Sequence, residues 1–372
     1  MALEIAALSP RRLAARLAAG IDSTLLTLSL LLVALGLATL FSASYDQPAR
    51  VTAQVANLAV ALVAMWLVAQ LPPQTLMRFA VPAYCLGLAL LVGVALAGEV
   101  VNGARRWLHV GVVRFQPSEV MKLALPMMLA WYFHLNEAGL RMRNFAVAAL
   151  LLAVPVLLIA RQPDLGTAVL VAAAGFYVIF FAGIGWKVLV SLGVLGAASL
   201  FPLWGMLHDY QRRRILTLID PSQDPLGAGY HTIQSTIAVG SGGITGKGWL
   251  HGTQSHLEFI PERHTDFIFA VFSEEFGLVG NALLLTLYVL LIARGLMIAA
   301  NAATFFARLL AASVTLMFFT YAFVNMGMVS GILPVVGVPL PFISYGGTSL
   351  LTLFIGIGIL MSVHSHRRLV QT

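Results

Sequence analysis

The segment FIPERHTDFIFAV, residues 259–271, places four ionisable residues directly before an apolar run that continues to Ile292. The four residues are Glu262, Arg263, His264 and Asp266. About 20 apolar residues are enough for a helix to cross the hydrocarbon core of a bilayer. The segment therefore predicts a membrane-spanning helix with a charged entrance.

Apolar runs of similar length occupy most of the remaining chain. The 372 residues are 59% hydrophobic and 10% charged, with a mean hydropathy of +0.90, whereas about 25% of the residues in soluble domains are charged. Apolar runs lie at 23–43, 51–71, 79–98, 117–135, 145–160, 165–184, 186–206, 266–292, 303–330 and 345–363. We therefore predict an all-α polytopic membrane protein with about ten transmembrane helices, folded as a single membrane domain over residues 1–372.

Basic residues indicate the topology. An even number of spans puts both termini on one side, and the excess of Lys and Arg in cytoplasmic loops identifies that side. Basic residues precede the first span and follow the last one: Arg11, Arg12, Arg16, Arg367 and Arg368. Both termini are therefore predicted to be cytoplasmic. The same topology puts further basic residues in short inner loops: Arg78, Arg141, Arg143, Lys187, Arg294 and Arg308.

Several cations fall on the outer side of this topology, where the rule disfavours them. Arg105 and Arg106 in the segment GARRWL and Arg263 are examples, and the others are Arg114, Arg161, Arg212, Arg213, Arg214 and Lys247. Guanidinium groups bind carboxylate and phosphate through paired hydrogen bonds. An anionic ligand therefore explains the outer arginines, and pairing with acidic residues of the same loops, such as Glu262, is the alternative.

Two outer connections stand out by length or composition. The loop between spans 7 and 8, residues 208–265, is nearly sixty residues long, and we expect it to cover the outer face with short helices around 233–239. The segment GILPVVGVPLPFISYGGTS, residues 331–349, carries three prolines and four glycines. We interpret 331–344 as a re-entrant or broken outer segment. The N–H groups that follow Ser344 then form a candidate anion site, although helix capping explains the glycines equally well.

The fourth span contains a buried charge pair. In QPSEVMKLAL, Glu119 and Lys122 are three residues apart and share one helical face. Each charge alone costs about 2.5–3.5 kcal/mol on insertion into a membrane, so we expect the two side chains to face the bundle interior and to neutralise each other or a ligand. A purely structural ion pair is the alternative.

Asp266 is the candidate general base. We place it in the first turn of the eighth span, where the positive end of the helix dipole stabilises a carboxylate, together with a second carboxylate, a guanidinium and an imidazole within four residues. Burial at the membrane boundary raises the pKa of such a carboxyl, whereas Arg263 or Lys122 lowers it. A simple helix cap formed by Thr265 or Asp266 is the alternative.

Other chemistries lack their motifs. GSGGITGKGW, residues 240–249, imitates a phosphate-binding loop, but Ser241 replaces its first glycine and Gly248 follows the lysine. The histidines form no zinc-binding spacing. Nothing in the sequence indicates a nucleotide, haem or nucleic-acid site.

The chain resembles the SEDS family, named for shape, elongation, division and sporulation. The resemblance rests on NGARRWLHVGVVRFQPSEVMKLAL, RQPDLGTA, GSGGITGKGWLHGTQSHLEFIPERHTDFIFAVFSEEFG, NMGMVSGILPVVGVPLPFISYGGTSLL and the closing HSHRR. It covers the chain from about residue 24 to residue 368. FIPERHTDFIFAV and the short tails indicate the elongation branch of the family rather than its division branch.

The resemblance implies a peptidoglycan glycosyltransferase of cell elongation, a multi-pass protein of the cytoplasmic (inner) membrane. It would polymerise lipid II into glycan strands with its active site facing the periplasm. The implied partners are a class B penicillin-binding transpeptidase and other membrane proteins of the elongation complex, without nucleic acid. Asp266 matches the essential aspartate of the family.

On this reading, cations stabilise the departing diphosphate, alone or with a divalent cation such as Mg²⁺; the candidates are Arg105, Arg106, Lys122 and Arg263. Glu119 orients Lys122 or joins Asp266 in holding the metal. Glu262 and Ser344 complete the expected substrate-binding set. The alternative functions are a lipid II flippase, which needs charges along a path through the membrane, and a non-catalytic scaffold for the penicillin-binding protein.

Overall fold

The computed structural model describes residues 20–101, 104–110, 113–206, 212, 216–218, 220, 228–257, 259–260 and 262–367. Several residues used in the topology prediction lie outside the described ones: Arg11, Arg12, Arg16, Arg213, Arg214 and Arg368. The same holds for parts of the predicted outer loop 208–265. The side chain of Arg105 is also outside the description.

Long helices occupy the places of all ten apolar runs. They are α3 (Ser23–Ala43), α4 (Pro48–Ala69), α5 (Pro73–Ala97), α6 (Pro117–Leu135), α7 (Met142–Arg161), α8 (Leu165–Phe181), α9 (Trp186–Met206), α13 (Ile268–Ala300), α14 (Phe305–Val329) and α15 (Gly347–Ser365). Prolines in the first turn begin α4, α5 and α6, whereas Asp22, Asp164 and Thr304 cap α3, α8 and α14 through their side chains. The prediction of an all-α membrane fold is confirmed.

Seven of these helices are long and apolar enough to cross a membrane: α3, α4, α5, α7, α13, α14 and α15. Helix α8 and the first part of α9 are apolar but shorter. Helix α6 carries Glu119 and Lys122 in its interior. The number of ten spans therefore stays a prediction.

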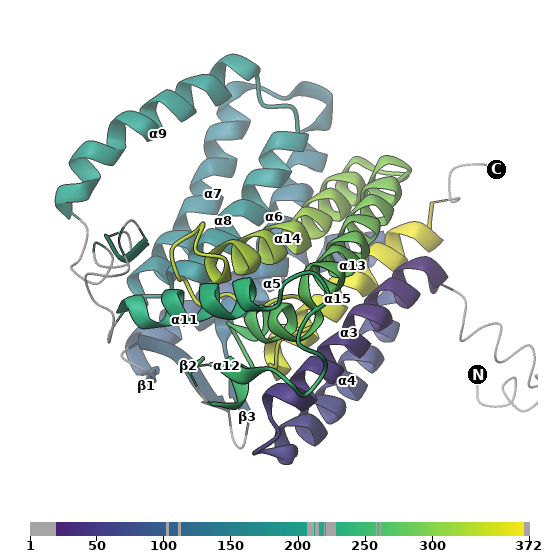
Figure 1. The fold of residues 1–372 in the computed structure, drawn as a ribbon. Helices are drawn as coiled ribbons and strands as arrows, with labels where there is room; N and C mark the ends of the chain where they lie inside the picture. The colour runs from purple at the N-terminus through teal and green to yellow at the C-terminus, as the bar shows by residue number, and fades with distance from the viewer. Residues whose placement is uncertain are drawn as a thin grey trace, which may run out of the picture.

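The strands and the short helices α11 (Ala228–Ser241) and α12 (Thr253–His256), but not the 3-10 helix, gather at one end of the helix bundle (Figure 1). Helix α11 matches the helix expected around 233–239. The connection between α5 and α6 forms an antiparallel sheet that the sequence did not predict. Its strands, in the order β1-β2-β3, are β1 (Glu99–Val101), β2 (Ala104–Val110) and β3 (Val113–Phe115). A 3-10 helix, η1 (Glu137–Gly139), joins α6 to α7.

The first and last long helices meet at the opposite end, which we call the Asp22 end. Asp22, the cap of α3, lies 3.4 Å from His364 near the end of α15 and also binds Arg294 of α13. Both described ends of the chain therefore lie on the same side, as an even number of spans requires. Because successive helices alternate in direction, residue 266 lies at the other end, which we call the Asp266 end.

Helix α13 is interrupted at Gly277, whose φ of 62° and ψ of −158° are not helical. Two carbonyl groups and two N–H groups lose their helical partners there, and the loop 240–248 supplies replacements. The four bonds are each 3.0 Å long and run from Lys247 N to Glu274 O, Gly248 N to Glu275 O, Leu278 N to Gly243 O and Val279 N to Ile244 O. Backbone groups at membrane depth must be satisfied within the protein, so this loop makes the break tolerable.

The glycines of that loop permit its close approach to α13. A Cβ at Gly246 would lie 2.0 Å from the carbonyl oxygen of Glu275, and Gly246 also has a φ of +80°. The fully buried carboxylate of Glu274 adds to the attachment, since it accepts bonds from Lys247 Nζ at 2.7 Å and from Thr253 N at 2.9 Å. The segment that imitates a phosphate-binding loop is thus a structural partner of α13.

Candidate functional site

Asp266 belongs to a turn that precedes α13 rather than to the helix itself, which begins at Ile268. Residues 331–344, predicted as a re-entrant or broken segment, form neither helix nor strand, and the end of this segment holds the turn in place. Ser344 Oγ donates to Thr265 O at 2.7 Å, and Tyr345 N donates to His264 O at 2.9 Å. Two segments almost eighty residues apart in sequence therefore build one surface at the Asp266 end.

Asn325, in the last turns of α14, ties the two segments together. It is fully buried, and its Nδ2 donates to Asp266 O at 2.8 Å and to Val338 O at 2.7 Å. Gly337 lies against the aspartate side chain, because a Cβ at that position would be 3.2 Å from Asp266 Oδ2. The backbone of Asp266 is thus fixed from α14 while its carboxylate faces the re-entrant segment.

The environment of Asp266 favours a carboxylate that exchanges protons near neutral pH. Burial raises its pKa to about 6, from an ordinary value of 3.8. The Glu262 and Asp164 carboxylates contribute to this rise by repulsion, whereas the Arg106 guanidinium opposes it. Burial therefore outweighs the nearby cation in setting the pKa of the Asp266 carboxyl. The cation that opposes burial is Arg106. A general base works best with a pKa near the operating pH.

A second cluster of polar side chains surrounds Asp164, the residue that caps α8. Arg106 Nη2, from β2, donates to Pro163 O at 3.0 Å, and its Nε lies 4.0 Å from Asp164 Oδ2. Gln116, directly before α6, donates to the same Asp164 oxygen at 3.0 Å. The unexpected sheet thus delivers one of the predicted outer arginines to the neighbourhood of Asp266.

The predicted pair of Glu119 and Lys122 is formed, with 2.5 Å between Oε1 and Nζ. Both side chains are buried, and Lys122 also binds the hydroxyl of Tyr321 from α14. Glu119 Oε2 is buried without a hydrogen-bond partner among the described residues. Gln116, the partner of Asp164, lies one turn before Glu119, and its carbonyl accepts from Glu119 N at 3.0 Å.

The other predicted binding residues have mainly structural contacts. Arg263 is 5% exposed, and it donates to Ala43 O at 2.8 Å and to Asp46 Oδ1 at 2.9 Å, which clamps the turn to the end of α3. The hydroxyl of Ser344 is occupied by its bond to Thr265 O and by Leu340 N at 2.7 Å. Glu262 is exposed beside the turn. Their roles toward a substrate stay predictions.

Helix α11 covers this end of the bundle. It packs against α13 and α14, and the ring of His231 stacks on Phe267 with 5.7 Å between ring centroids. Burial lowers the pKa of His231, against the opposing effect of Glu262. The described part of the long loop thus covers the Asp266 end of the bundle, as we expected from the length of the loop.

Sequence reasoning missed several residues of this site, above all Asp164 and Asn325. Asp164 carries the same signal as Asp266, because it is a carboxylate directly before an apolar run. Asn325 is a polar residue inside an apolar span, which is by default a candidate functional position. In the described part of the chain, no group of three or more His, Cys, Asp or Glu side chains could hold a metal ion.

Comparisons with known proteins match nearly the whole chain. The family model of the cell cycle proteins FtsW, RodA and SpoVE matches residues 22–369. The peptidoglycan glycosyltransferase MrdB of Escherichia coli K12 is 51% identical over 352 residues, which are 94% of this chain and 95% of that protein.

Solved structures agree with the family match. A chain from a structure on the coordination of polymerization and crosslinking by a peptidoglycan synthase complex superposes with a TM-score of 0.81 and 37% identity, covering 94% of this chain and 98% of that one. The rod shape determining protein RodA of Thermus thermophilus gives a TM-score of 0.71 at 32% identity, covering 93% of this chain and 97% of that one.

Proposed function

The chain belongs to the FtsW/RodA/SpoVE family of cell cycle proteins, and on that premise we propose that Asp266 is the general base of its polymerisation reaction. It is a peptidoglycan glycosyltransferase of cell elongation, in keeping with the resemblance to MrdB and RodA. Its substrate is lipid II, a sugar joined through a diphosphate to a polyprenyl chain. The observation that carries the proposal is Asp266, whose backbone carbonyl is held by Asn325 and whose carboxylate lies against Gly337 with a pKa of about 6.

The reaction needs one proton acceptor and stabilisation of one leaving group. Asp266 accepts the proton of the acceptor GlcNAc 4-hydroxyl as that oxygen forms a bond to the anomeric carbon of the donor. The bond from that carbon to the diphosphate breaks, and the polyprenyl diphosphate leaves with the electron pair. General-base assistance of this kind contributes about 10²- to 10⁴-fold in rate.

Cations support the leaving group in this proposal. Arg106 is the described arginine beside Asp266, and its side chain is partly exposed at this surface. Lys122 is already neutralised by Glu119. It can therefore stabilise the diphosphate only indirectly, through the polar side chains around Asp164, or directly once the substrate separates the pair. Arg105 is retained as a candidate from its position in β2 next to Arg106.

A divalent cation such as Mg²⁺ is compatible with these residues. Mg²⁺ is commonly bound by one or two carboxylates together with substrate phosphates. No described group of three His, Cys, Asp or Glu side chains could hold the metal, so Asp266 would bind it together with the substrate diphosphate, and Glu119 as a second protein ligand stays a prediction. When bound, the metal would neutralise diphosphate charge.

The arrangement of charges supports polymerisation at one face, which we assign to the periplasm. Asp266, Glu262, Arg106 and Asp164 lie together at one end of the bundle, and Glu119 occupies the first turn of α6 at that same end. A flippase needs polar groups along a path to the other end. A scaffold needs no carboxylate with a raised pKa.

The partner is a penicillin-binding protein that crosslinks the strands, as in the synthase complex of the similar structure. We assign its docking site to an apolar groove of about 350 Å³ between α13 and α14. Phe319 and Phe323 line the groove and stack at 5.7 Å, and they are 42% and 55% exposed. Its exposed aromatic lining would suit a membrane helix of a class B transpeptidase. Phe323→Arg should abolish co-purification of the partner.

The test is polymerisation of purified lipid II by the protein with its transpeptidase partner, comparing wild type with Asp266→Asn. Glu137→Gln is the matched control, because it makes the same change of carboxylate to amide at an exposed residue of the Asp22 end. We expect long glycan strands from wild type and the control and none from Asp266→Asn. Strands of normal length from Asp266→Asn would exclude the assignment, and loss of activity with a chelator would add the metal.

A further inference from the structure

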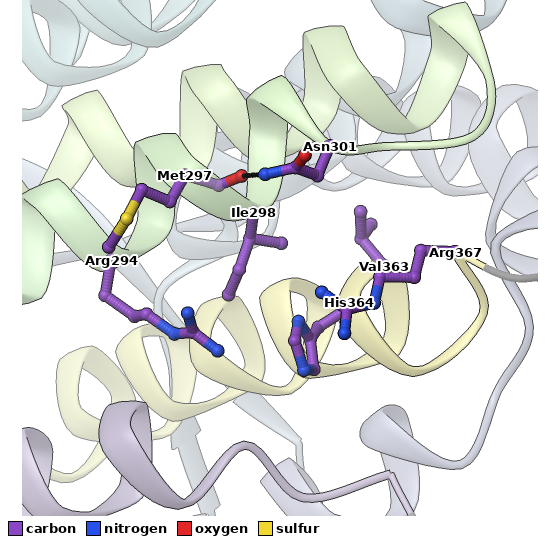
Figure 2. Close-up of a pocket in the computed structure, with 7 residues that line it drawn as sticks. All are labelled: Arg294, Met297, Ile298, Asn301, Val363, His364 and Arg367. Atoms are coloured by element: carbon purple, nitrogen blue, oxygen red, sulfur yellow. Dashed lines mark hydrogen bonds between the residues drawn. The ribbon is translucent and has the colours of Figure 1, made fainter.

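A small pocket lies at the Asp22 end of the bundle, between α13 and α15. Its volume is about 80 Å³, and Figure 2 shows Arg294 reaching from α13 toward the end of α15, where His364 lies. The polar lining residues are Arg294, Asn301, His364 and Arg367. Such a volume exceeds the space of single water molecules, yet it is far below the roughly 300–1,000 Å³ of pockets for drug-sized ligands.

The charges around this pocket do not balance. Asp22 is its one acidic neighbour among the described residues, and it contacts both Arg294 and His364. Burial alone would raise the pKa of Asp22, but hydrogen bonds from Arg294 and from Leu25 N hold that pKa below its ordinary value. Asp22 is therefore ionised and neutralises Arg294. Arg367 has no acidic partner within the described part of the chain, which leaves one positive charge facing the pocket.

We propose that this pocket binds one phosphate group, supplied by the headgroup of an anionic phospholipid. A single phosphodiester carries the one negative charge that balances Arg367. The guanidinium groups of Arg294 in α13 and of Arg367 in the turn after α15 can bind its oxygens, and arginine binds phosphate through such paired hydrogen bonds. Basic pockets between transmembrane helices are recurrent sites for phospholipid headgroups.

The position of the pocket favours a lipid over a soluble anion. The pocket lies near the ends of two long apolar helices, where a spanning helix meets the headgroups, and Ile298 and Val363 form apolar walls beside the cations. Arg294 lies near the far end of α13, 26 residues after the start of the helix at Ile268, whereas Asp266 lies just before that start. The pocket is thus separate from the proposed active site, and binding there does not depend on catalysis.

Occupancy should stabilise the fold, because one ligand would join α13 to α15 beside the cap of α3. A ligand that binds only the folded state raises its apparent stability. The test measures thermal unfolding of purified protein in neutral detergent during titration with phosphatidylglycerol. Phosphatidylcholine, which carries the same phosphodiester without net charge, and inorganic phosphate are titrated in parallel.

Arg367→Gln removes the unpaired cation from an exposed position, and Arg308→Gln is its matched control. Arg308 is an exposed arginine near the same end of the bundle that does not line the pocket. We expect phosphatidylglycerol to raise the unfolding temperature of wild type and of Arg308→Gln, with apparent affinity about tenfold weaker in Arg367→Gln. Phosphatidylcholine and inorganic phosphate should have little effect.

Other outcomes would overturn the proposal. Equal weakening in both variants would mean general electrostatic attraction to the membrane surface. Stabilisation by inorganic phosphate equal to that by phosphatidylglycerol would exclude a lipid source. No stabilisation by any of the three ligands would exclude a phosphate site altogether.

Discussion

The dependence of polymerisation on pH follows from the surroundings of Asp266. With a pKa of about 6, the ionised fraction of its carboxyl is about 0.9 at pH 7 and about 0.1 at pH 5. The base form is lost as the pH falls through 6, so kcat/KM should fall about tenfold between pH 7 and pH 5. With the ordinary value of 3.8, about 94% of the carboxyl would remain ionised at pH 5, and the rate would barely change.

Two variants should move the fall of kcat/KM at low pH, the acid limb of the pH profile, in opposite directions. Glu262→Gln removes a carboxylate that raises the pKa of Asp266, so the limb should shift to lower pH. Arg106→Gln removes the cation that lowers it, so the limb should shift to higher pH. Glu137→Gln, at the other end of the bundle, should leave the limb in place.

The assay is the initial rate of glycan strand formation from lipid II at fixed ionic strength between pH 5 and pH 8. A flat profile over this range would refute the raised pKa. Shifts of the same sign in the Glu262 and Arg106 variants would refute the electrostatic explanation.

Three further predictions concern stability and positioning. Asp266→Asn should raise the unfolding temperature above pH 6, because it removes a charge whose burial costs up to about 3 kcal/mol, the equivalent of a pKa raised from 3.8 to about 6. Gly246→Ala should lower the unfolding temperature by many degrees, since its Cβ would meet Glu275 O at 2.0 Å, whereas Gly243→Ala, also at positive φ but in open space, should cost only about 1 kcal/mol. Asn325→Leu should lower kcat up to about 100-fold with lipid II binding retained, because the peptide of Asp266 loses its anchor. Unfolding curves and kcat measurements decide these three outcomes.

The helices were predictable because the bilayer imposes their length. Each apolar run had to become a helix to satisfy its own backbone groups, and each of the ten expected runs coincides with one. Asp266, Glu119 and Lys122 were recognisable for a related reason, since charges within or beside apolar runs are costly and need a partner or a function. The burial of the Glu119–Lys122 pair agrees with that expectation.

Contacts between distant segments were not predictable. The break at Gly277 depends on four backbone partners from a loop about thirty residues earlier, and the local sequence reads as one continuous helix. Arg263 lies in the same turn as Asp266, but the end of α3 offers it Asp46 and Ala43 O. Arg106 instead reaches the neighbourhood of Asp266 through strand β2, which no apolar run or motif indicated.

The most direct test of the central claim separates catalysis from binding in Asp266→Asn. The measurement is kcat for lipid II polymerisation beside the dissociation constant for lipid II, in the complex with the transpeptidase at pH 7.5. A general base predicts a loss of about 10²- to 10⁴-fold in kcat with the dissociation constant changed only a few-fold. A kcat within tenfold of wild type, or a loss confined to lipid II binding, would contradict the role of Asp266 as the base.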